Sequence, residues 1–392
     1  MMSFSNTKTS SSTDWLNSIC ILSTGLHPIG GAEMQVSELA KALHTREWHV
    51  RVVSMLPATG EIQSELTRLG IPVHSLGMTK GTADPRAILR LGKLIREYRP
   101  SILHSHMIHA NLLARITRAV VHVPFQISTV HSIQEGGRLR ELAYRLTDHW
   151  ADKTTAISEA AAHRYVDVGA ARLRNMRVIP NGVDTARFRP DCELRKNART
   201  ALALEENFIW LAAGRICEAK DYTTLLHAFA TIPDNKAVLL IAGDGPGLAE
   251  LRGLALALGI AKRTHFLGFR TDTAALMNAA DGYVMSSRYE GMPMVLLEAS
   301  ACALPIVATD VGGNAEVVKS GRLVPPACPS ALGQAMCDVM AQSNEVRIAS
   351  GAAGRDYTVR HFSMENVISQ WEHLYRSLLE VDPPSASRAC SH

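Results

Sequence analysis

Glu290 and Glu298 are two carboxylates separated by seven residues, and they follow a short apolar run at 283–285. Pro293 lies between them, and proline suits the first turn of a helix because its missing N–H has no partner to lose there. We therefore expect a strand, a loop that carries Glu290, and a helix from about Met294 that carries Glu298. The free N–H groups at the start of that helix favour an anion. A diphosphate beside carboxylates that accept hydroxyl hydrogen bonds describes a nucleotide sugar; the alternative is a solvated loop residue and a surface charge.

Arg215 and Lys220 form a second candidate set, in the stretch 214–221 between an apolar run at 208–213 and an expected helix at 222–230. Two cations five positions apart across a strand-to-helix turn can converge on a diphosphate. The arginine would act as a two-pronged donor and the lysine as a point charge. The alternative is ordinary surface charge, which is the commonest fate of these residue types.

Gly30 and Gly31 precede an expected helix at 32–43, whose apolar residues recur at spacings of three and four. Paired glycines let a backbone approach a ligand closely and leave N–H groups exposed at a helix start. The stretch matches neither the Gly-x-Gly-x-x-Gly dinucleotide motif nor the phosphate-binding P-loop motif. A tight turn without a ligand is the alternative interpretation.

Histidines and acidic residues were considered as metal ligands. His104, His106 and His109 resemble a cluster but lack a fourth ligand at a suitable spacing, so we expect no metal site. The chain also has no Asp-x-Asp sequence, which could hold Mg²⁺ or Mn²⁺ on a diphosphate. His131 ends an expected strand at 126–130 and is a candidate hydrogen-bond donor in a ligand crevice; the alternative is a buried imidazole with satisfied hydrogen bonds.

The elements that must position these groups follow one pattern, in which short β-branched runs alternate with helical periodicity, as in parallel sheets. We expect strands at 19–23, 49–54, 73–76, 102–104, 126–130, 154–157, 177–179, 208–213, 237–242, 265–267, 283–285 and 306–308, and late helices at 355–360 and 364–379. A polar stretch at 190–199 interrupts the pattern, so we place a domain boundary near Pro190. Each half is expected to be a doubly wound α/β layer structure that binds ligands at the carboxyl ends of its strands.

Composition limits the class of protein. The chain has 392 residues, 46% hydrophobic and 20% charged, which fits a globular enzyme with two domains. Its seven cysteines form no Cys-x-x-Cys pair and indicate reduced thiols in a cytosolic protein. No apolar window is long enough to span a membrane, and the Ser- and Thr-rich residues 1–17 are expected to be a disordered leader.

Charge is unevenly distributed. The first 190 residues have 23 Lys and Arg against 15 Asp and Glu, and the remainder has 18 against 22. The first half is therefore expected to meet an anionic partner such as a phosphorylated acceptor or a membrane surface. Nucleic acid is not expected, because only 5% of residues are aromatic and no stripe of alternating Arg and aromatic residues occurs.

These motifs, taken in order, resemble the family 4 retaining glycosyltransferases, which have the two-domain GT-B fold. The resemblance covers residues 19–326, about four-fifths of the chain. The matching pieces are Gly30-Gly31-Ala32-Glu33, Thr129-Val130-His131, Ile179-Pro180-Asn181-Gly182-Val183-Asp184, Gly214-Arg215 with Lys220, Gly243-Asp244-Gly245-Pro246, Phe266-Leu267-Gly268-Phe269, the segment from Glu290 to Glu298, Gly312-Gly313-Asn314-Ala315-Glu316 and Leu323-Val324-Pro325-Pro326. The chain departs from the family pattern at Asp221, since a glycine is commoner after the lysine.

The resemblance implies two Rossmann-like doubly wound domains facing each other across a cleft that holds a nucleotide sugar, expected to be a UDP-sugar. Arg215 and Lys220 would neutralise the diphosphate, Glu298 would bind the ribose hydroxyls and Glu290 the hydroxyls of the donor sugar. The other implied positions are Gly31, Gly291, Met294 and Val295 as donor-binding residues and His131, with Glu290, Arg215 and Lys220, as a catalytic residue.

The resemblance also implies retention of configuration, no cofactor and no metal. The acceptor would be a saccharide or a polyprenyl-linked saccharide of polysaccharide biosynthesis, at the cytoplasmic face of the membrane. The expected divisions are the leader at 1–17, an acceptor-binding domain at 18–190, a donor-binding domain at 191–356, helices at 357–382 that cross back to the first domain, and a tail at 383–392. Alternative functions are a nucleotide-sugar 2-epimerase on the same fold and a non-catalytic nucleotide-sugar-binding subunit.

Overall fold

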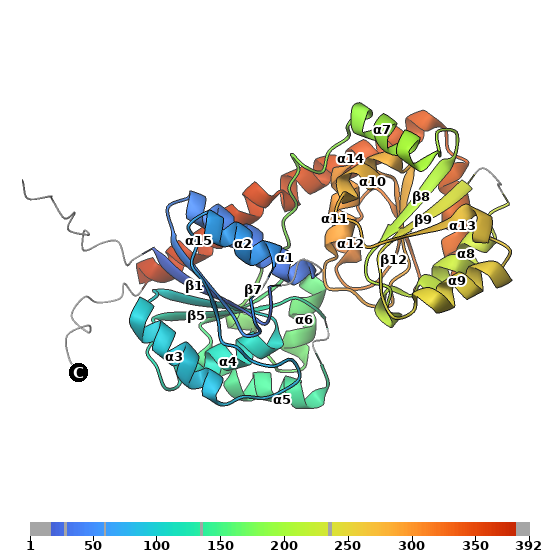
Figure 1. The fold of residues 1–392 in the computed structure, drawn as a ribbon. Helices are drawn as coiled ribbons and strands as arrows, with labels where there is room; N and C mark the ends of the chain where they lie inside the picture. The colour runs from blue at the N-terminus through green and yellow to red at the C-terminus, as the bar shows by residue number, and fades with distance from the viewer. Residues whose placement is uncertain (1–16, 27–29, 59, 134–135, 234–236, 382–392) are drawn as a thin grey trace, which may run out of the picture. The chain divides into compact units, whose positions relative to one another are not determined.

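The computed structural model describes residues 17–26, 30–58, 60–133, 136–233 and 237–381 (Figure 1). The expected tail, and the expected leader except residue 17, lie outside the described residues. The chain forms two compact units. The first contains the described parts of Met1–Ala156, Tyr165–Arg177 and Ile368–His392, and the second contains Ile157–Arg164 and Val178–Val367.

The first unit is built on a seven-stranded sheet in the order β3-β2-β1-β4-β5-β6-β7, with parallel pairing from β3 to β6. Its strands are β1 (Ser18–Ser23), β2 (His49–Ser54), β3 (Val73–Ser75), β4 (Ile102–His106), β5 (Phe125–Val130), β6 (Lys153–Ala156) and β7 (Met176–Val178). Helices α1 (Gly31–Thr45), α2 (Glu61–Arg68) and the end of α15 (Met364–Val381) cover one face, and α3 (Arg86–Tyr98), α4 (Ile108–Arg118) and α5 (Arg138–Thr147) cover the other (Figure 1). The helix α6 (Glu159–Asp167) follows β6.

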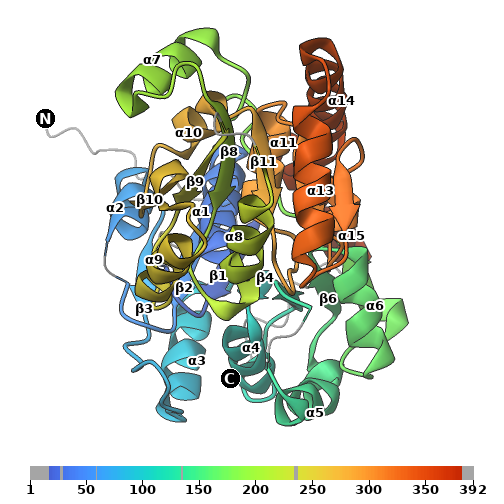
Figure 2. The ribbon, with the colours of Figure 1, turned by 90° about the vertical axis from the view of Figure 1, so that its right-hand side faces the viewer.

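The second unit has a six-stranded parallel sheet in the order β10-β9-β8-β11-β12-β13. Its strands are β8 (Phe208–Ala213), β9 (Ala237–Ala242), β10 (Thr264–Gly268), β11 (Gly282–Met285), β12 (Ile306–Thr309) and β13 (Arg322–Val324). Helices α8 (Tyr222–Ala230), α9 (Leu248–Ala257) and α13 (Pro329–Met340) cover one face (Figure 2), and α10 (Thr273–Ala279), α11 (Met294–Ala301) and α14 (Asn344–Phe362) cover the other.

Burial on both faces explains the continuous apolar strands. In β8, Ile209 and Leu211 pack into the core beneath α10 and α11, whereas Trp210 and Ala212 pack into the core beneath α8 and α13. Because both faces are covered, every position of such a strand favours an apolar residue. In both units the first strand lies beside the second on one side and the fourth on the other, which is the Rossmann order. The predicted fold class of two Rossmann-like α/β domains is confirmed.

The segment that was expected to be a polar break contains a helix, α7 (Cys192–Leu202). Asp191 caps this helix by accepting a hydrogen bond from the backbone N–H of Leu194 at 2.9 Å. Arg195 and Arg199 then form ion pairs with Asp281, so the polar residues of the segment attach α7 to the second unit. Before α7, the chain passes from the first unit to the second for the last time between Arg177 and Val178.

Two other elements differ from expectation. The strand β13 (Arg322–Val324) was not expected, because three residues are too few to show a strand pattern. The helix expected at 355–360 extends over Asn344–Phe362 as α14, and Ser343 caps its start through a hydrogen bond to the backbone N–H of Val346.

The C-terminal helix α15 completes the first unit from Ile368 onward. The hydroxyl of Tyr375 lies 2.8 Å from Nδ1 of His104, a buried residue of β4, and Nε2 of His104 lies 2.6 Å from Oγ1 of Thr129. Tyr375 also packs edge-on against Trp48, with ring centroids 5.5 Å apart. Glu372 accepts hydrogen bonds from Arg46 at 2.8 Å and from the indole of Trp48 at 3.3 Å. The last helix therefore supplies buried polar and aromatic partners to the first sheet.

Two further observations concern the cysteines and the helices. Among the described residues, all six cysteines are free thiols. No helix within the described ranges combines the length and the apolar character needed to cross a bilayer.

Candidate active site

The candidate site of the second unit lies where its strand order reverses. Strand β8 has β9 on one side and β11 on the other, with Trp210 and Leu211 of β8 opposite Gly282 and Tyr283 of β11. The chain leaves β8 and β11 toward helices on opposite faces of the sheet, and the carboxyl ends of strands at such a reversal point are where open α/β sheets bind their ligands. Arg215 and Lys220 follow β8, and Glu290 follows β11.

Lys220 and Glu290 form an ion pair across these two loops. Nζ of Lys220 lies 2.5 Å from Oε1 of Glu290, and the hydroxyl of Ser287 donates to the same oxygen at 2.6 Å. Both charged side chains are largely buried, with exposed fractions of 20% for Lys220 and 11% for Glu290. Within the described part of the chain, Oε2 of Glu290 has no hydrogen-bond partner. The carboxylate is thus fixed through one oxygen, and the other is available to a ligand.

Arg215 is exposed, and its guanidinium makes no ion pair with any residue that the structure describes. Its loop begins at Gly214, whose φ of +141° is a conformation that side chains rarely adopt. The loop packs on the turn after β9, because the N–H of Gly214 donates to Ala242 at 3.0 Å and that of Ile216 to Asp244 at 2.9 Å. A Cβ on Gly245 would lie 2.1 Å from the carbonyl oxygen of Ile216, so the glycine-rich turn is needed for this close approach.

Asp221 explains how the chain does without a glycine after Lys220. Its φ is +45°, in the left-handed region that favours glycine, asparagine and aspartate. Its carboxylate is buried, accepts from the hydroxyl of Thr224 at 2.8 Å as the cap of α8, and pairs with Arg288 at 3.0 Å. The backbone N–H of Arg288 donates to Ala219 at 2.8 Å, and the hydroxyl of Ser286 donates to Lys220 at 2.9 Å. The loops after β8 and β11 are therefore bound to each other on both sides of the Lys220–Glu290 pair.

The loop before α11 is held mainly by main-chain contacts. The carbonyl oxygen of Gly291 accepts from the N–H of Gly313 at 2.8 Å, and a Cβ on Gly313 would lie 2.4 Å from that oxygen. The side-chain amide of Asn181 donates to the carbonyl of Met292 at 2.9 Å. Helix α11 then begins at Met294, followed by Val295, with Pro293 as a cap residue that provides no side-chain hydrogen bond. The helix start lies where the sequence predicted an anion site.

Glu298 lies one turn into α11 and is half-buried. Burial raises its pKa to about 7, against the opposing effect of the positive charge of Arg187. Among the described residues its carboxylate has no hydrogen-bond or ion-pair partner. A carboxylate with a raised pKa and free oxygens can accept hydrogen bonds from ligand hydroxyls, which favour its ionised form.

The first unit carries the remaining candidates, Gly31 and His131. Gly31 is the first residue of α1, and Gly30 is its cap residue without a side-chain hydrogen bond. His131 follows β5, and its Nε2 lies 2.9 Å from Nδ1 of His106 at the end of β4. Burial lowers the pKa of His131 to about 4, so its imidazole is neutral at pH 7. His131 is thus suited to hydrogen bonding and not to carrying a positive charge.

Sequence reasoning identified the charged residues of the second unit but missed several that position them. Ser287, Arg288 and Asn181 contact the site loops. Ser287 and Arg288 precede the motif that begins at Glu290, and Asn181 lies within the motif at 179–184, to which no role was assigned. A polar residue directly after an apolar strand is the signal that could have found Ser287. Of the three histidines named as candidate metal ligands, His104 and His106 lie with ring centroids 4.0 Å apart. The described residues contain no group of three or more His, Cys, Asp or Glu that could hold a metal ion.

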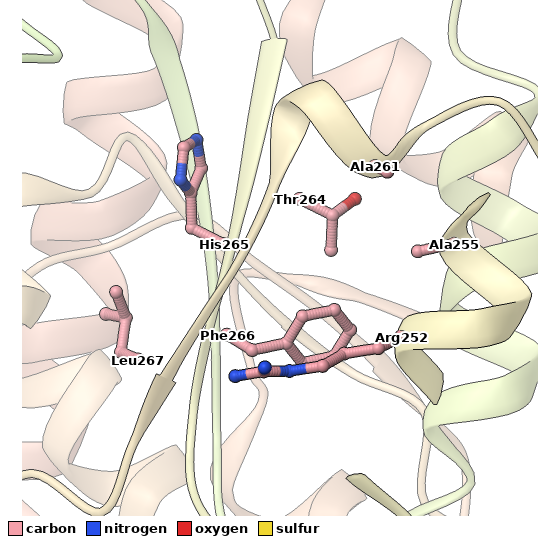
Figure 3. Close-up of a pocket in the computed structure, with 7 residues that line it drawn as sticks. All are labelled: Arg252, Ala255, Ala261, Thr264, His265, Phe266 and Leu267. Atoms are coloured by element: carbon pink, nitrogen blue, oxygen red, sulfur yellow. The ribbon is translucent and has the colours of Figure 1, made fainter. Parts of the chain in front are cut away.

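A separate pocket lies at the outer edge of the second sheet and contains none of the predicted site residues (Figure 3). Its volume is about 350 Å³, and it is lined along β10 and α9 by Arg252, Thr264 and Phe266 among others. The guanidinium carbon of Arg252 lies 5.9 Å from the ring centroid of Phe266. The pocket lies along β10, which is two strands away from β8 in the sheet order, so the pocket is distinct from the candidate site.

Comparison with known proteins defines the class. The family model described as Glycosyltransferase Family 4 matches residues 29–187, and the one described as Glycosyl transferases group 1 matches residues 195–355. A GDP-mannose-dependent alpha-(1-6)-phosphatidylinositol monomannoside mannosyltransferase of Mycobacterium tuberculosis is 31% identical over 260 residues, covering 62% of this chain and 67% of that protein. The chain therefore belongs to the family 4 glycosyltransferases, whose members transfer sugars from nucleotide-sugar donors. The predicted family and enzyme class are confirmed.

Other relatives differ in their substrates. The UDP-Gal:alpha-D-GlcNAc-diphosphoundecaprenol alpha-1,3-galactosyltransferase of Escherichia coli is 28% identical over 250 residues, covering 60% of this chain and 65% of its own length, just under two thirds. A D-inositol 3-phosphate glycosyltransferase of Corynebacterium urealyticum is 28% identical to this chain. The similarity covers 90% of this chain and 92% of that protein. The fold is shared with the solved structure of Anabaena HepE in complex with UDP and glucose, with a TM-score of 0.82, 22% identity and coverage of 92% of this chain and 99% of that one.

The raised pKa of Glu298 predicts a pH dependence of stability. Because its folded-state pKa of about 7 lies above the ordinary value of 4.5, ionisation opposes folding. Relative to a Glu298→Gln variant, the parent protein is expected to lose about 3 kcal/mol of unfolding free energy as the pH rises from 4.5 to well above 7. Urea unfolding of both proteins at intervals across this range measures the difference. Parallel profiles would show that the carboxyl group of Glu298 titrates normally.

Proposed function

We propose that the chain transfers a sugar from a UDP-sugar to a saccharide acceptor carried on a lipid diphosphate, with retention of configuration, in polysaccharide biosynthesis. The observation that carries this proposal is the paired Lys220 and Glu290 beside exposed Arg215, at the reversal point of the second sheet. The E. coli relative named for UDP-Gal and the HepE complex with UDP support uridine. Because the mycobacterial relatives are named for GDP-mannose, a UDP-sugar donor must be tested against a GDP-sugar.

The cations act on the leaving group. As the bond between the anomeric carbon and the phosphate oxygen breaks, its electron pair stays on the phosphate, so negative charge grows there. Arg215 offers a guanidinium with no competing carboxylate among the described residues, and Lys220 has N–H donors beyond the one used by Glu290. Because these charges stabilise the departing diphosphate more than the bound donor, they lower the barrier.

The carboxylates act on hydroxyl groups. Glu290, held at Oε1 by Lys220 and Ser287, presents Oε2 to the hydroxyls of the donor sugar, and Glu298 accepts from the ribose. The acceptor hydroxyl oxygen bonds to the anomeric carbon on the face from which the diphosphate leaves, and its proton passes to the departing phosphate oxygen. This sequence balances charge and retains configuration, and it assigns Glu290 a binding role and not that of a nucleophile.

The first unit supplies the acceptor-binding surface in this proposal. Neutral His131 and the N–H groups at Gly31 are its polar contributions to substrate binding. The excess of basic residues in the first half of the chain supports an anionic, lipid-linked acceptor and attachment of the protein to the cytoplasmic face of a membrane.

A donor screen tests the proposal. UDP-, GDP- and ADP-sugars are added in turn, and stabilisation against heat is measured; a ligand at a hundred times its Kd stabilises the folded state by about 2.7 kcal/mol. We expect UDP-sugars to stabilise, and a short-chain polyprenyl diphosphate saccharide then to receive the sugar with its anomeric configuration retained. Conversion of the donor without an acceptor would instead indicate an epimerase, and binding without turnover a non-catalytic subunit.

Replacing Lys220 tests the role of the diphosphate contact. A hydrogen bond to a charged group contributes about 1.5 to 3 kcal/mol, so Lys220→Ala is expected to lower kcat/KM about ten- to a hundredfold. Affinity for the free nucleoside, which lacks phosphate, should not change. The matched control is Lys262→Ala, an exposed lysine of the same unit, which should leave kinetics unaltered. If the two variants behave alike, Lys220 does not contact the donor.

We also propose that transfer needs no divalent metal, because Arg215 and Lys220 supply the positive charge and the sequence has no Asp-x-Asp. Dialysis against EDTA is expected to leave the rate of transfer within about twofold of the untreated enzyme, and added Mg²⁺ or Mn²⁺ should not increase it. A rate that disappears with EDTA and returns with either ion would contradict the proposal.

A further inference from the structure

The surface of helix α5 carries an unusual set of exposed leucines. Leu139, Leu142 and Leu146 have exposed fractions of 83%, 49% and 64%. They occur at i, i+3 and i+7 and therefore form one stripe along the helix. The opposite side of α5 is the side that packs, since Tyr144 and Thr147 are buried. Figures 1 and 2 show α5 on the outside of the first unit, in the layer that contains α4.

A fourth exposed leucine lies near the end of α5. Asp148, directly after α5, pairs with Arg172 at 3.0 Å. This ion pair places the short helix Leu173–Asn175 beside the end of α5, and Leu173 is 73% exposed. We name Leu139, Leu142, Leu146 and Leu173 the leucine patch. Contiguous exposed apolar residues of this kind mark interaction sites in soluble proteins.

Positive charge borders the leucine patch. Arg138 lies one helical turn before Leu142 and Arg145 one turn after it, and both flank the same side of the stripe. Arg174 follows Leu173 in the sequence. All three arginines are exposed. Aliphatic residues in the centre and arginines at the edge are the pattern of helices that lie in the plane of a membrane. The apolar side chains enter the boundary of the acyl chains while the arginines remain among the headgroups.

We propose that the leucine patch on α5 is the surface by which the first unit docks on an anionic lipid membrane. This inference rests on the proposed function, because a lipid-linked acceptor requires the enzyme to work at a bilayer. The arginine border of the patch complements negatively charged headgroups, and the first 190 residues carry an excess of basic charge.

Vesicle sedimentation tests the proposal with the full chain. The parent protein is expected to bind vesicles that contain phosphatidylglycerol and to bind pure phosphatidylcholine much more weakly. The variant Leu139→Gln/Leu142→Gln/Leu146→Gln should lower the partition coefficient on phosphatidylglycerol vesicles about tenfold or more. The variant Arg138→Gln/Arg145→Gln should lose binding at about 0.1 M salt but differ little from the parent at about 1 M, where charges are screened.

The matched control is Leu89→Gln. Leu89 is 69% exposed on α3 of the same unit and lies outside the leucine patch, so this variant should bind vesicles as the parent does. Transfer to a water-soluble, short-chain acceptor should be unchanged in all variants, whereas KM for a long-chain acceptor in vesicles should rise in the leucine variant and, at about 0.1 M salt, in the arginine variant. If the parent protein does not transfer sugar to the soluble acceptor, the proposed function is contradicted and the docking surface is not.

If the leucine variant does not fold, a second measurement tests the proposal. Leu142→Trp adds a fluorophore to the five native tryptophans, and brominated phosphatidylglycerol should quench this variant more than the parent, whereas Leu89→Trp should be quenched no more than the parent. Equal quenching at both positions would overturn the proposal. So would a leucine variant that changes the oligomeric state in sedimentation velocity but keeps full vesicle binding, because the patch would then join two copies of the chain.

Discussion

The parallel pairing of β8 with β11 is the constraint on which the site of the second unit depends. These strands are neighbours in space but are separated in the chain by β9 and β10, and their loops bring together residues 70 positions apart. A parallel sheet places the carboxyl ends of all its strands at one edge, and the reversal of strand order there separates the helices that would otherwise fill the space. Lys220 and Glu290 meet for this reason, because each lies in the segment that follows one of these two strands.

The ion pair between Lys220 and Glu290 has two effects, one on the charges of the site and one on the orientation of Glu290. It gives a largely buried lysine and a largely buried carboxylate a partner of opposite charge within the protein itself. It also fixes the orientation of Glu290 before the donor arrives, with Ser287 as a second donor. Preorganisation of this kind matters because groups that are already oriented need no rearrangement as charge develops on the leaving group.

The sequence predicted most of the fold because its strands are buried on both faces. The runs at 208–213 and 237–242 are continuously apolar, and the structure has strands with these bounds. The helix α7 was missed because Arg195 and Arg199 look like solvated residues until Asp281, about 80 positions away, is known to be beside them. Local periodicity cannot show a partner at such a separation, and the same limit hid Glu372 and Tyr375 as partners of β4 and the segment before β2.

The residue types of the candidate site were predicted from their positions after strands, but their geometry was not. The sequence showed Asp221 only as a departure from glycine, whereas the structure shows one residue that adopts a left-handed backbone, caps α8 and pairs with Arg288. These three properties come from the loop conformation, which neighbouring residues alone do not specify.

The position of α15 has a consequence for how the protein is made. The first unit needs Tyr375 to pair with His104 and Glu372 to pair with Arg46, and these residues lie close to the end of the chain. During synthesis from the N-terminus, the second unit is complete once Val367 has left the ribosome, whereas the first sheet still lacks its last helix. The half of the protein that is translated first is therefore the half that finishes folding last. Until α15 packs on the first sheet, His104 lacks its hydrogen bond with the hydroxyl of Tyr375.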